Sequence, residues 1–202
     1  MNAKMEKGQR NRGATETVIL DAVGELVEAG GFENLGINAV AAQAGVSKML
    51  IYRYFESMDG LIAAYVRQYD FWINFDEEFP ADENLRDFVK QMFRNQIANL
   101  RTNNTLRKFY RWELTSYNDH VKQLREQREA AGVRLIQAGS KVTGKPDAEI
   151  AGLVTIFSAA ISYLSLLEEN CDVYNGIPIQ EEAGWQQIEN TVNQMIDIYL
   201  NQ

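Results

Sequence analysis

The sequence predicts an all-α protein of about nine helices, divided into a small N-terminal domain and a larger C-terminal one. In nearly every segment, apolar residues recur at the three- and four-residue spacing of amphipathic helices, and the alternation typical of strands is rare. Only three prolines interrupt these segments: Pro80, Pro146 and Pro178. Of the 202 residues, 46% are hydrophobic and 24% are charged, which is typical of a soluble globular chain that buries a sizeable core.

Residues 1–58 are expected to hold an N-terminal arm and the first three helices. Apolar stripes and glycine stop signals place these helices at about 15–30, 37–44 and 47–55. Thr15 or Thr17 is a suitable cap for the first helix, and Gly45 ends the second. Two short helices joined by a tight glycine turn are typical of a helix-turn-helix, which presents its second helix to the major groove of DNA.

Residues 59–202 are expected to form a second, helical domain. A fourth helix, capped by Ser57, leaves the N-terminal domain and continues to about Phe75. Later apolar stripes predict helices at about 85–100, 105–117, 118–135, 146–170 and 185–199. A loop around Asn175–Gly176 separates the last two.

The charge distribution favours a DNA-facing surface in the N-terminal domain, although the chain has a formal net charge of -8. Residues 1–58 carry six basic and seven acidic side chains, so almost all of the negative charge lies beyond them. From Asn34 to Phe55 there is no Asp or Glu. Because phosphates repel carboxylates and attract Lys and Arg, this acid-free segment is the expected contact surface for DNA.

Residues 37–61 resemble the signature of the TetR family of transcriptional regulators in the run INAVAAQAGVSKMLIYRYFESMDGL. The likeness includes the Ala-Gly-Val-Ser turn at 44–47, the Ile-Tyr-x-Tyr-Phe pattern at 51–55, and Leu61. It extends upstream to Ile19-Leu20-x-Ala22 and Gly31-Phe32, and covers about a quarter of the chain. The resemblance implies a helix-turn-helix DNA-binding domain followed by a helical domain that binds a ligand and dimerises.

The sequence departs from the family pattern at two positions. Gly36 stands where a Ser or Thr usually caps the second helix, and Met58 stands where a Lys is common at the start of the fourth. Each departure removes a possible phosphate contact. DNA affinity is therefore expected to depend more on the basic N-terminal arm, with Lys4, Lys7, Arg10 and Arg12, unless that arm is only a frayed tail.

Side-chain chemistry assigns a role to most residues of the expected DNA-binding surface. Lys48 and the hydroxyls of Tyr52 and Tyr54 suit phosphates, which fix position without reading sequence. Arg53 suits a bidentate contact to guanine, and Met49 suits a thymine methyl group. The alternative for Tyr54 is a core aromatic with a wet edge, and for Arg53 an unpaired surface arginine. The full set adds three residues to these: Ser47, Arg10 and Arg12.

The C-terminal domain is expected to bind an amphipathic or aromatic small molecule. Aromatic residues are concentrated in its central helices and could line a cavity with a few polar groups. The candidate ligand residues are Tyr69, Trp72, Phe75, Phe93, Phe109, Trp112, Glu113 and Tyr163. The alternative is that each of them packs in a core without a cavity.

The last two predicted helices carry more apolar surface than a monomer of this size should expose. The family resemblance implies that they pair with the same helices of a second copy in a four-helix bundle. The candidate interface residues are Val154, Ile161, Leu164, Ile188, Val192, Met195 and Tyr199.

Several other functions have no support in the sequence. A single cysteine, Cys171, and a single histidine, His120, make a poor zinc site, and neither a catalytic constellation nor a phosphate-binding loop is apparent. We therefore expect no enzyme, no metal, no cofactor and no membrane anchor, and a cytoplasmic location. The expected function is a homodimeric regulator, a repressor that a small ligand releases from a palindromic operator. The alternative is a helical protein-interaction adaptor that has lost DNA binding.

Overall fold

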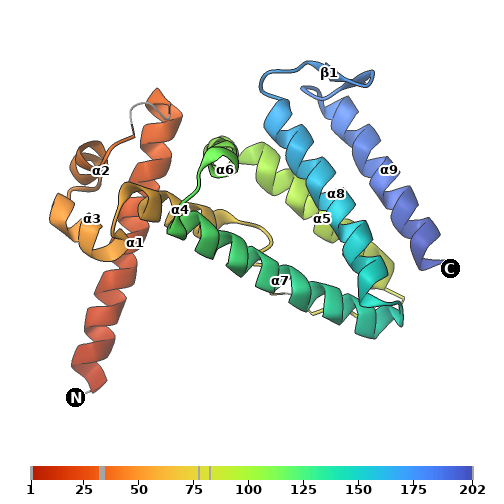
Figure 1. The fold of residues 1–202 in the computed structure, drawn as a ribbon, viewed down its shortest axis with the longest axis horizontal. Coiled ribbons are helices and arrows are strands. Elements are labelled where there is room, and N and C mark those ends of the chain that lie inside the picture. The colour runs from red at the N-terminus through yellow and green to blue at the C-terminus, as the bar shows by residue number, and fades with distance from the viewer. Residues whose placement is uncertain (1, 32–34, 77, 82, 202) are drawn as a thin grey trace. The chain divides into compact units, whose positions relative to one another are not determined.

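The computed structural model describes residues 2–31, 35–76, 78–81 and 83–201, with side chains from Arg12 onward. Over these residues the chain is all-α, as predicted, apart from one short hairpin (Figure 1). The helices are α1 (Asn2–Gly30), α2 (Ile37–Ala44), α3 (Lys48–Phe55), α4 (Met58–Tyr69), α5 (Leu85–Thr102), α6 (Asn104–Thr115), α7 (Asp119–Thr143), α8 (Asp147–Leu167) and α9 (Glu182–Leu200). The hairpin strands are β1 (Val173–Tyr174) and β2 (Ile177–Pro178).

The chain forms two compact units whose boundary differs from the expected division at residue 58. The first unit contains Met1–Asp70 and Lys108–Leu124, and the second contains Phe71–Arg107 and Arg125–Gln202. Helices α6 and α7 therefore each contribute residues to both units. The sequence gives no signal for this because a helix that continues from one core into another keeps a single amphipathic pattern.

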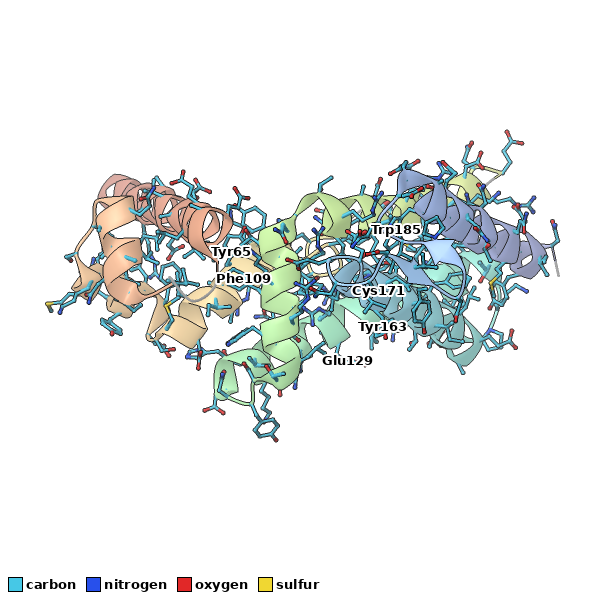
Figure 2. The ribbon with its side chains drawn as sticks, turned by 90° about the horizontal axis from the view of Figure 1, so that it is seen from above. Tyr65, Phe109, Glu129, Tyr163, Cys171 and Trp185 are labelled. Carbon is cyan, nitrogen blue, oxygen red and sulfur yellow. The ribbon has the colours of Figure 1, made fainter. Side chains whose placement is uncertain are left out.

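The first unit has a core of apolar side chains from α1 to α4 and from the returning α6 and α7. Its fully buried members include Ile19, Val23, Val27, Val40, Ile51, Leu61, Phe109 and Leu124. Figure 2 shows Tyr65 beside Phe109, with ring centroids 4.9 Å apart in an edge-to-face arrangement. Aromatic pairs of this geometry add about 0.5–1.5 kcal/mol beyond the burial of their area.

Helix α1 begins at Asn2, well before the expected start near residue 15. The arm is therefore a helical extension instead of a frayed tail. Residues 2–14 contain no proline, and their Ala, Lys, Met, Glu, Gln and Arg residues favour the helix, whereas Gly8 and Gly13 oppose it. Arg12 pairs with Glu16 one turn later at 2.8 Å, and the Thr17 hydroxyl donates to the Gly13 carbonyl instead of capping a helix start.

Helix α4 ends at Tyr69, before the expected end near Phe75. The reason is Asp70, which is fully buried and has extended backbone angles. Its carboxylate accepts a hydrogen bond of 2.7 Å from the Tyr110 hydroxyl on α6. Because a buried carboxylate needs partners, this contact fixes Asp70 outside the helix.

The second unit is built around α5, which packs against both α8 and α9. Phe93 of α5 lies edge-to-face on Phe157 of α8, with centroids 5.3 Å apart. The hairpin between α8 and α9 turns at Asn175 and Gly176, both with positive φ. Such Asn-Gly turns match the twist of a two-residue hairpin, so this sequence signal predicts strands where only a loop was expected.

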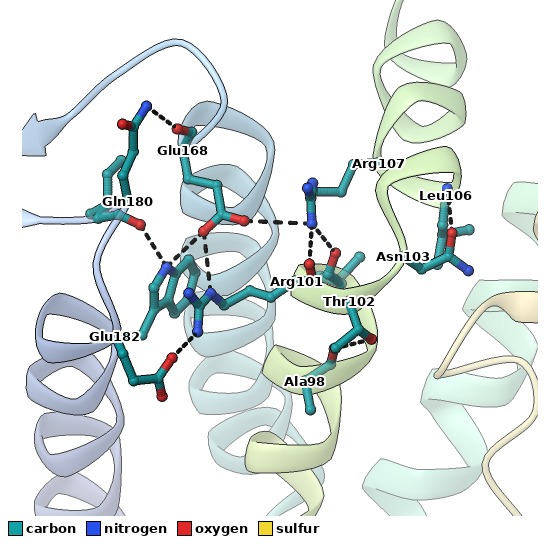
Figure 3. A network of polar contacts seen from close by, with 12 residues as sticks. Ala98, Arg101, Thr102, Asn103, Leu106, Arg107, Glu168, Gln180 and Glu182 are labelled. Atoms are coloured by element: carbon teal, nitrogen blue, oxygen red, sulfur yellow. Dashed lines mark hydrogen bonds and ion pairs between the residues drawn. The ribbon is translucent and has the colours of Figure 1, made fainter. Parts of the chain in front are cut away.

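An ionic network joins α5, α6, α8 and α9 within the second unit (Figure 3). The Glu168 carboxylate accepts hydrogen bonds from Arg101 Nε at 3.2 Å and from the indole N–H of Trp185 at 2.8 Å. Arg107 lies 3.5 Å from the same carboxylate and also donates to the carbonyls of Leu100 and Arg101 at the end of α5. A largely buried carboxylate with several charge-assisted partners fixes the relative positions of these four helices.

Candidate nucleic-acid interface

The turn between α2 and α3 has the backbone geometry of a helix-turn-helix. Gly45 adopts the left-handed conformation with φ of 65°, and the Val46 N–H donates to the Ala41 carbonyl at 3.0 Å. A residue with a Cβ is strained at this φ, so glycine suits the end of α2. The Ser47 hydroxyl then caps α3 by accepting from the Leu50 N–H at 3.3 Å. Gly36 gives α2 no side-chain cap, as its lack of a hydroxyl requires.

Helix α3 presents one face to the core and the other to solvent. Ile51 is fully buried and Phe55 is 8% exposed, whereas Met49 is 77% exposed and Tyr52 is 49% exposed. The remaining outward side chains, Lys48 and Arg53, are exposed as well. All of the outward positions except Glu56 at the end of α3 are uncharged or basic, so this face suits a polyanion.

Tyr54 is half-buried and brings together two arginines that are far apart in the sequence. Its ring centroid lies 5.0 Å from the Arg12 guanidinium of α1 and 5.4 Å from that of Arg53. Contacts of this kind are favourable because the ring face carries partial negative charge. Tyr54 thus places a cation from α1 next to α3, a relation that helical periodicity could not indicate. The side chain of Arg10, also expected to contact DNA, lies outside the described residues.

The start of α4 holds the orientation of α3 through the predicted Ser57 cap and through contacts to α7 that the sequence does not indicate. The Ser57 hydroxyl accepts from the Gly60 N–H at 2.9 Å and lies 3.1 Å from Nε2 of His120. Asn118 donates from its amide to Asp59 at 3.1 Å and caps α7 by accepting from the Val121 N–H at 3.0 Å. The beginnings of α4 and α7 are therefore bonded to each other.

Gly60 allows α4 to begin directly against the end of α3. A Cβ at this position would lie only 1.9 Å from the Phe55 carbonyl oxygen and 3.0 Å from the His120 ring. The available sequence signal is a glycine in the first turn of a helix, where a stronger helix former is normally preferred.

The candidate ligand residues divide between the two units. Trp72 and Phe93 line an apolar cavity of about 60 Å³ in the second unit. Phe75 packs against Trp72 but is not part of that cavity wall. Tyr163 is 54% exposed, and its ring packs edge-on against Tyr174 of the hairpin. The four residues in the first unit are Tyr69, Phe109, Trp112 and Glu113.

Two of the first-unit residues have clear structural contacts. Phe109 is fully buried against Tyr65, and the Tyr69 hydroxyl donates to Asp21 at 3.4 Å. Burial, followed by the nearby Asp21 carboxylate, raises the pKa of Tyr69 above its ordinary value. The expected lining set is therefore not brought together in one unit.

The candidate interface residues also differ in exposure. Ile161 is 1% exposed and Val192 is 8% exposed, so both belong to the core of the protomer itself. Val154, Leu164, Ile188 and Tyr199 are half-buried, and Met195 is exposed. Val154 and Tyr199 contribute to the wall of the apolar cavity.

A different set of residues forms the exposed apolar surface of α8 and α9. Ile156 of α8 is 64% exposed and Ile198 of α9 is 61% exposed. Alongside them lie Gly152, Ala159, Ala160, Tyr163 and Met195 at helical spacing. By length and composition α8 could cross a membrane, with a mean hydropathy of 2.0 over an 18-residue window of which only 17% is buried.

Comparisons with known proteins connect these features to a family. Residues 19–65 match the model described as bacterial regulatory proteins, tetR family. No curated protein sequence matches the chain. The matched segment contains the Gly45 turn, the whole of α3 and the first part of α4.

Three solved structures share the fold over most of the chain. A candidate fatty acid metabolism regulator from Clostridium perfringens has a TM-score of 0.57 at 17% identity, covering 89% of this chain and 96% of its own. A TetR family transcription regulator from Marinobacter aquaeolei has a TM-score of 0.54 at 16% identity, with 88% and 97% covered. A candidate TetR-family regulator from Mesorhizobium loti gives 0.52 at 16% identity, with 94% and 96% covered.

The family model covers the helix-turn-helix, and the solved structures extend the same fold across α5 to α9. The likeness in those helices is one of fold alone, because the identities are low. Together with the geometry of the Gly45 turn and of α3, these matches show that residues 19–65 are a DNA-binding segment of the tetR family of bacterial regulatory proteins, in a chain that shares the fold of TetR family regulators.

Proposed function

We propose that this DNA-binding regulator acts as a homodimeric repressor that a small ligand releases from a palindromic operator. The observation that carries the proposal is the outward face of α3, where Lys48, Met49, Tyr52 and Arg53 project from a helix anchored by Ile51. A rigid helix with an exposed basic face fits the major groove. Since the operator of a bacterial regulator lies in the cytoplasm, the protein is expected there too.

The residues on α3 have separate tasks in this proposal. Arg53 donates two hydrogen bonds to guanine and Met49 contacts a thymine methyl group, so these residues read sequence. Lys48 and Tyr52 contact phosphates, with Arg12 and Arg10 adding charge from α1. The half-buried ring of Tyr54 supports the guanidinium groups of Arg12 and Arg53, so its main contribution is to position them.

Mobility-shift titration against an operator and its single-base variants tests these assignments. Arg53→Ala should weaken operator binding by about 1–3 kcal/mol and relax the preference at one base position. Lys48→Ala should weaken binding to every sequence similarly and reduce the salt dependence. Arg134→Ala, at an exposed position of α7 in the second unit, is the matched control and should leave binding unchanged. Equal, sequence-independent losses from both α3 variants would refute the division of roles.

The same titration tests the alternative function. A protein-interaction adaptor of this fold would retard no genomic fragment at low salt, and its α3 variants would behave like the wild type. The acidic net charge of -8 is the observation that favours this alternative.

The dimer part of the proposal depends on the exposed apolar surface of α8 and α9. The outer face of α8 carries Ile156, Ala159 and Tyr163, and that of α9 carries Met195 and Ile198. The small residues on α8 allow two copies of the helix to approach closely. A second copy of the chain would cover both faces in an isologous interface, and would place two α3 helices on one DNA duplex.

Ligand response requires a path from the second unit to α3, and α7 is the element that provides one. It is a continuous helix over Asp119–Thr143. Leu135 and Gly139 of this helix line the cavity, while His120 in its first turn contacts the cap of α4. Helix α4 does not provide a continuous path to Trp72, because this helix ends at Tyr69.

Replacing His120 tests this path. His120→Ala removes the contact to Ser57, so it should reduce the effect of a ligand on operator affinity more than it reduces the operator affinity of the empty protein. If the ligand still releases the variant as fully as it releases the wild type, α7 does not transmit the signal through this contact.

A further inference from the structure

Helices α8 and α9 each present one row of exposed residues with the spacing of a coiled-coil seam. The α8 row is Gly152, Ile156, Ala159 and Tyr163, and the α9 row is Gln187, Thr191, Gln194 and Ile198. In both rows the successive members are four, three and four residues apart. At 100° per residue, each row therefore lies within about 60° of the helix circumference. The a and d positions of a coiled coil repeat with this spacing and pack against another helix.

The charged residues of α9 lie on a different side of the helix, where they pair with α5. The ion pairs are Glu182 with Arg101 at 2.6 Å, Glu189 with Arg94 at 2.9 Å and Asp197 with Lys90 at 2.6 Å. These three carboxylates are all the charged side chains of α9, and α8 has none between Ala151 and Leu167. Exposed ion pairs add little to stability, but these keep the charge of α9 on the side of α5. Both rows are consequently free of charge.

The α9 row differs from the α8 row because two of its four members are amides. The side chains of Gln187 and Gln194 hydrogen-bond no residue in the described part of the chain, whereas the neighbouring Gln186 donates to Asn190 at 3.3 Å. A primary amide has both donors and acceptors, so it can pair with an identical amide. A charged side chain instead repels its own copy. The α9 row is therefore suited to contact with itself.

Polar residues within a coiled-coil seam have a known physical effect: they specify the register and the oligomeric state at a cost in stability. We propose that the α9 row packs against the α9 row of a second copy, and that Gln187 and Gln194 are the residues by which the chain recognises itself. Their amides hydrogen-bond across the interface, while the α8 row contributes apolar contact. The inference rests on the proposed function, because it takes the homodimer from there and assigns its specificity to two residues.

Charged versions of the α9 row test this contact directly. An acidic row carries Gln187→Glu with Gln194→Glu, and a basic row carries Gln187→Lys with Gln194→Lys. Whichever members of the two rows meet, each variant places like charges opposite each other in its homodimer. By analytical ultracentrifugation at low salt, the dimer Kd of each should rise at least about tenfold.

Mixing the two charged variants supplies the rescue. An equal mixture should form a heterodimer with a Kd within about threefold of the wild type, because opposite charges then meet across the interface. Native mass spectrometry distinguishes this species by its intermediate mass. Gln186→Glu and Gln186→Lys are the controls, since this exposed position lies on the same helix about 100° from Gln187. Each should dimerise as the wild type does, and their mixture should show no preference.

An apolar version of the α9 row tests the role of the amides in specificity. Gln187→Leu with Gln194→Leu should lower the dimer Kd at least about fivefold, because leucines bury more apolar surface than amides do. The same variant should also form species larger than a dimer, since its seam no longer specifies one partner and one register. Because all of these positions are exposed, the variants should keep the helical content of the wild type by circular dichroism.

Two results would overturn the inference: charged rows that dimerise as tightly as the wild type, or a mixture that shows no preference for the heterodimer. A leucine row that dissociates more readily than the wild type would do the same. If the wild type is dimeric and retards operator DNA without these effects, the regulator stands and the self-recognition fails. If it is monomeric at high micromolar concentration, the proposed homodimer fails and this inference with it. If the charge preference appears but no DNA is retarded, self-recognition stands and the proposed DNA-binding function fails.

Discussion

Replacing Gly60 by alanine is a direct test of how α4 fixes the recognition helix α3. The added methyl group would lie 1.9 Å from the Phe55 carbonyl oxygen, and ordinary contact begins at 3.4 Å, so the two groups must separate by a further 1.5 Å. The obstacle is backbone, which cannot rotate away as a side chain can. Helix α4 must therefore move relative to α3, and the bonds of Ser57 to Gly60 and His120, of 2.9 and 3.1 Å, must lengthen.

The expected loss combines two effects. Weakening the Ser57 cap costs about 1 kcal/mol, and accommodating an extra methyl against fixed atoms costs about 1–3 kcal/mol. The free energy of unfolding should thus fall by about 2–4 kcal/mol, and operator affinity should fall with it because α3 loses its support. Alanine is otherwise a better helix former than glycine, so without the clash Gly60→Ala should raise the free energy of unfolding. A decrease in that free energy therefore indicates the clash.

Urea denaturation and mobility shifts measure the two effects, with Gly132→Ala as the control. Gly132 lies within α7, and apart from its chain neighbours and the backbone of α7 itself no atom lies within 4 Å of where its Cβ would be. That variant should raise the free energy of unfolding by about 0.5–1 kcal/mol. The reasoning is refuted if Gly60→Ala stabilises the protein as Gly132→Ala does and keeps operator affinity within twofold.

Three further predictions concern the second unit. Glu168→Gln should lower the free energy of unfolding in urea by about 2–3 kcal/mol, because it leaves two arginines without their shared carboxylate. Glu182→Gln changes a side chain that is 80% exposed, so it should alter this free energy by less than about 0.5 kcal/mol. Equal effects of the two variants would contradict a special role for the network around Glu168. Ile156→Asp should give monomers by light scattering, while Leu114→Asp, at a 73% exposed position of the first unit, should stay dimeric. The raised pKa of Tyr199 means that its contribution to stability is complete below about pH 10 and is lost as pH rises through the folded-state value. The alkaline decline in Tm should therefore be smaller in Tyr199→Phe, and an identical decline would show that the hydroxyl does not titrate as described.

The helix-turn-helix could be predicted from the sequence because its determinants are local. Gly45 ends α2 through its own backbone conformation, Ser47 caps the residues that follow it, and Ile51 is buried four residues later. Each of these relations spans no more than one helical turn. The contact roles assigned to Lys48 and Arg53 stay predictions, because they depend on DNA.

The misplaced helix ends have a different origin. Helix α4 stops at Tyr69 because Asp70 bonds Tyr110, which lies 40 residues further along the chain. Apolar periodicity continues through Trp72, so the local pattern favours a longer helix than the tertiary contact allows. The start of α1 differs for the opposite reason: the polar N-terminal segment has no apolar stripe and contains Gly8 and Gly13, so its local pattern predicts an arm where the chain is helical.

The sequence predicts which kinds of residue line the cavity and the interface, but not which individual residues do so. The rotation of each helix about its own axis decides which of its apolar residues faces which neighbour. Helix α8 is apolar on all sides, so its sequence does not distinguish Ile161, which is buried, from Ile156, which is exposed. A helix that is apolar all round requires cover on every side in water. In the described part of the chain, that cover reaches only the inner side of α8. The same argument that places Ile161 in the protomer core therefore leaves the outer stripe uncovered in a single copy, and the proposed dimer should stabilise the fold of the second unit as well as set the spacing of the two recognition helices.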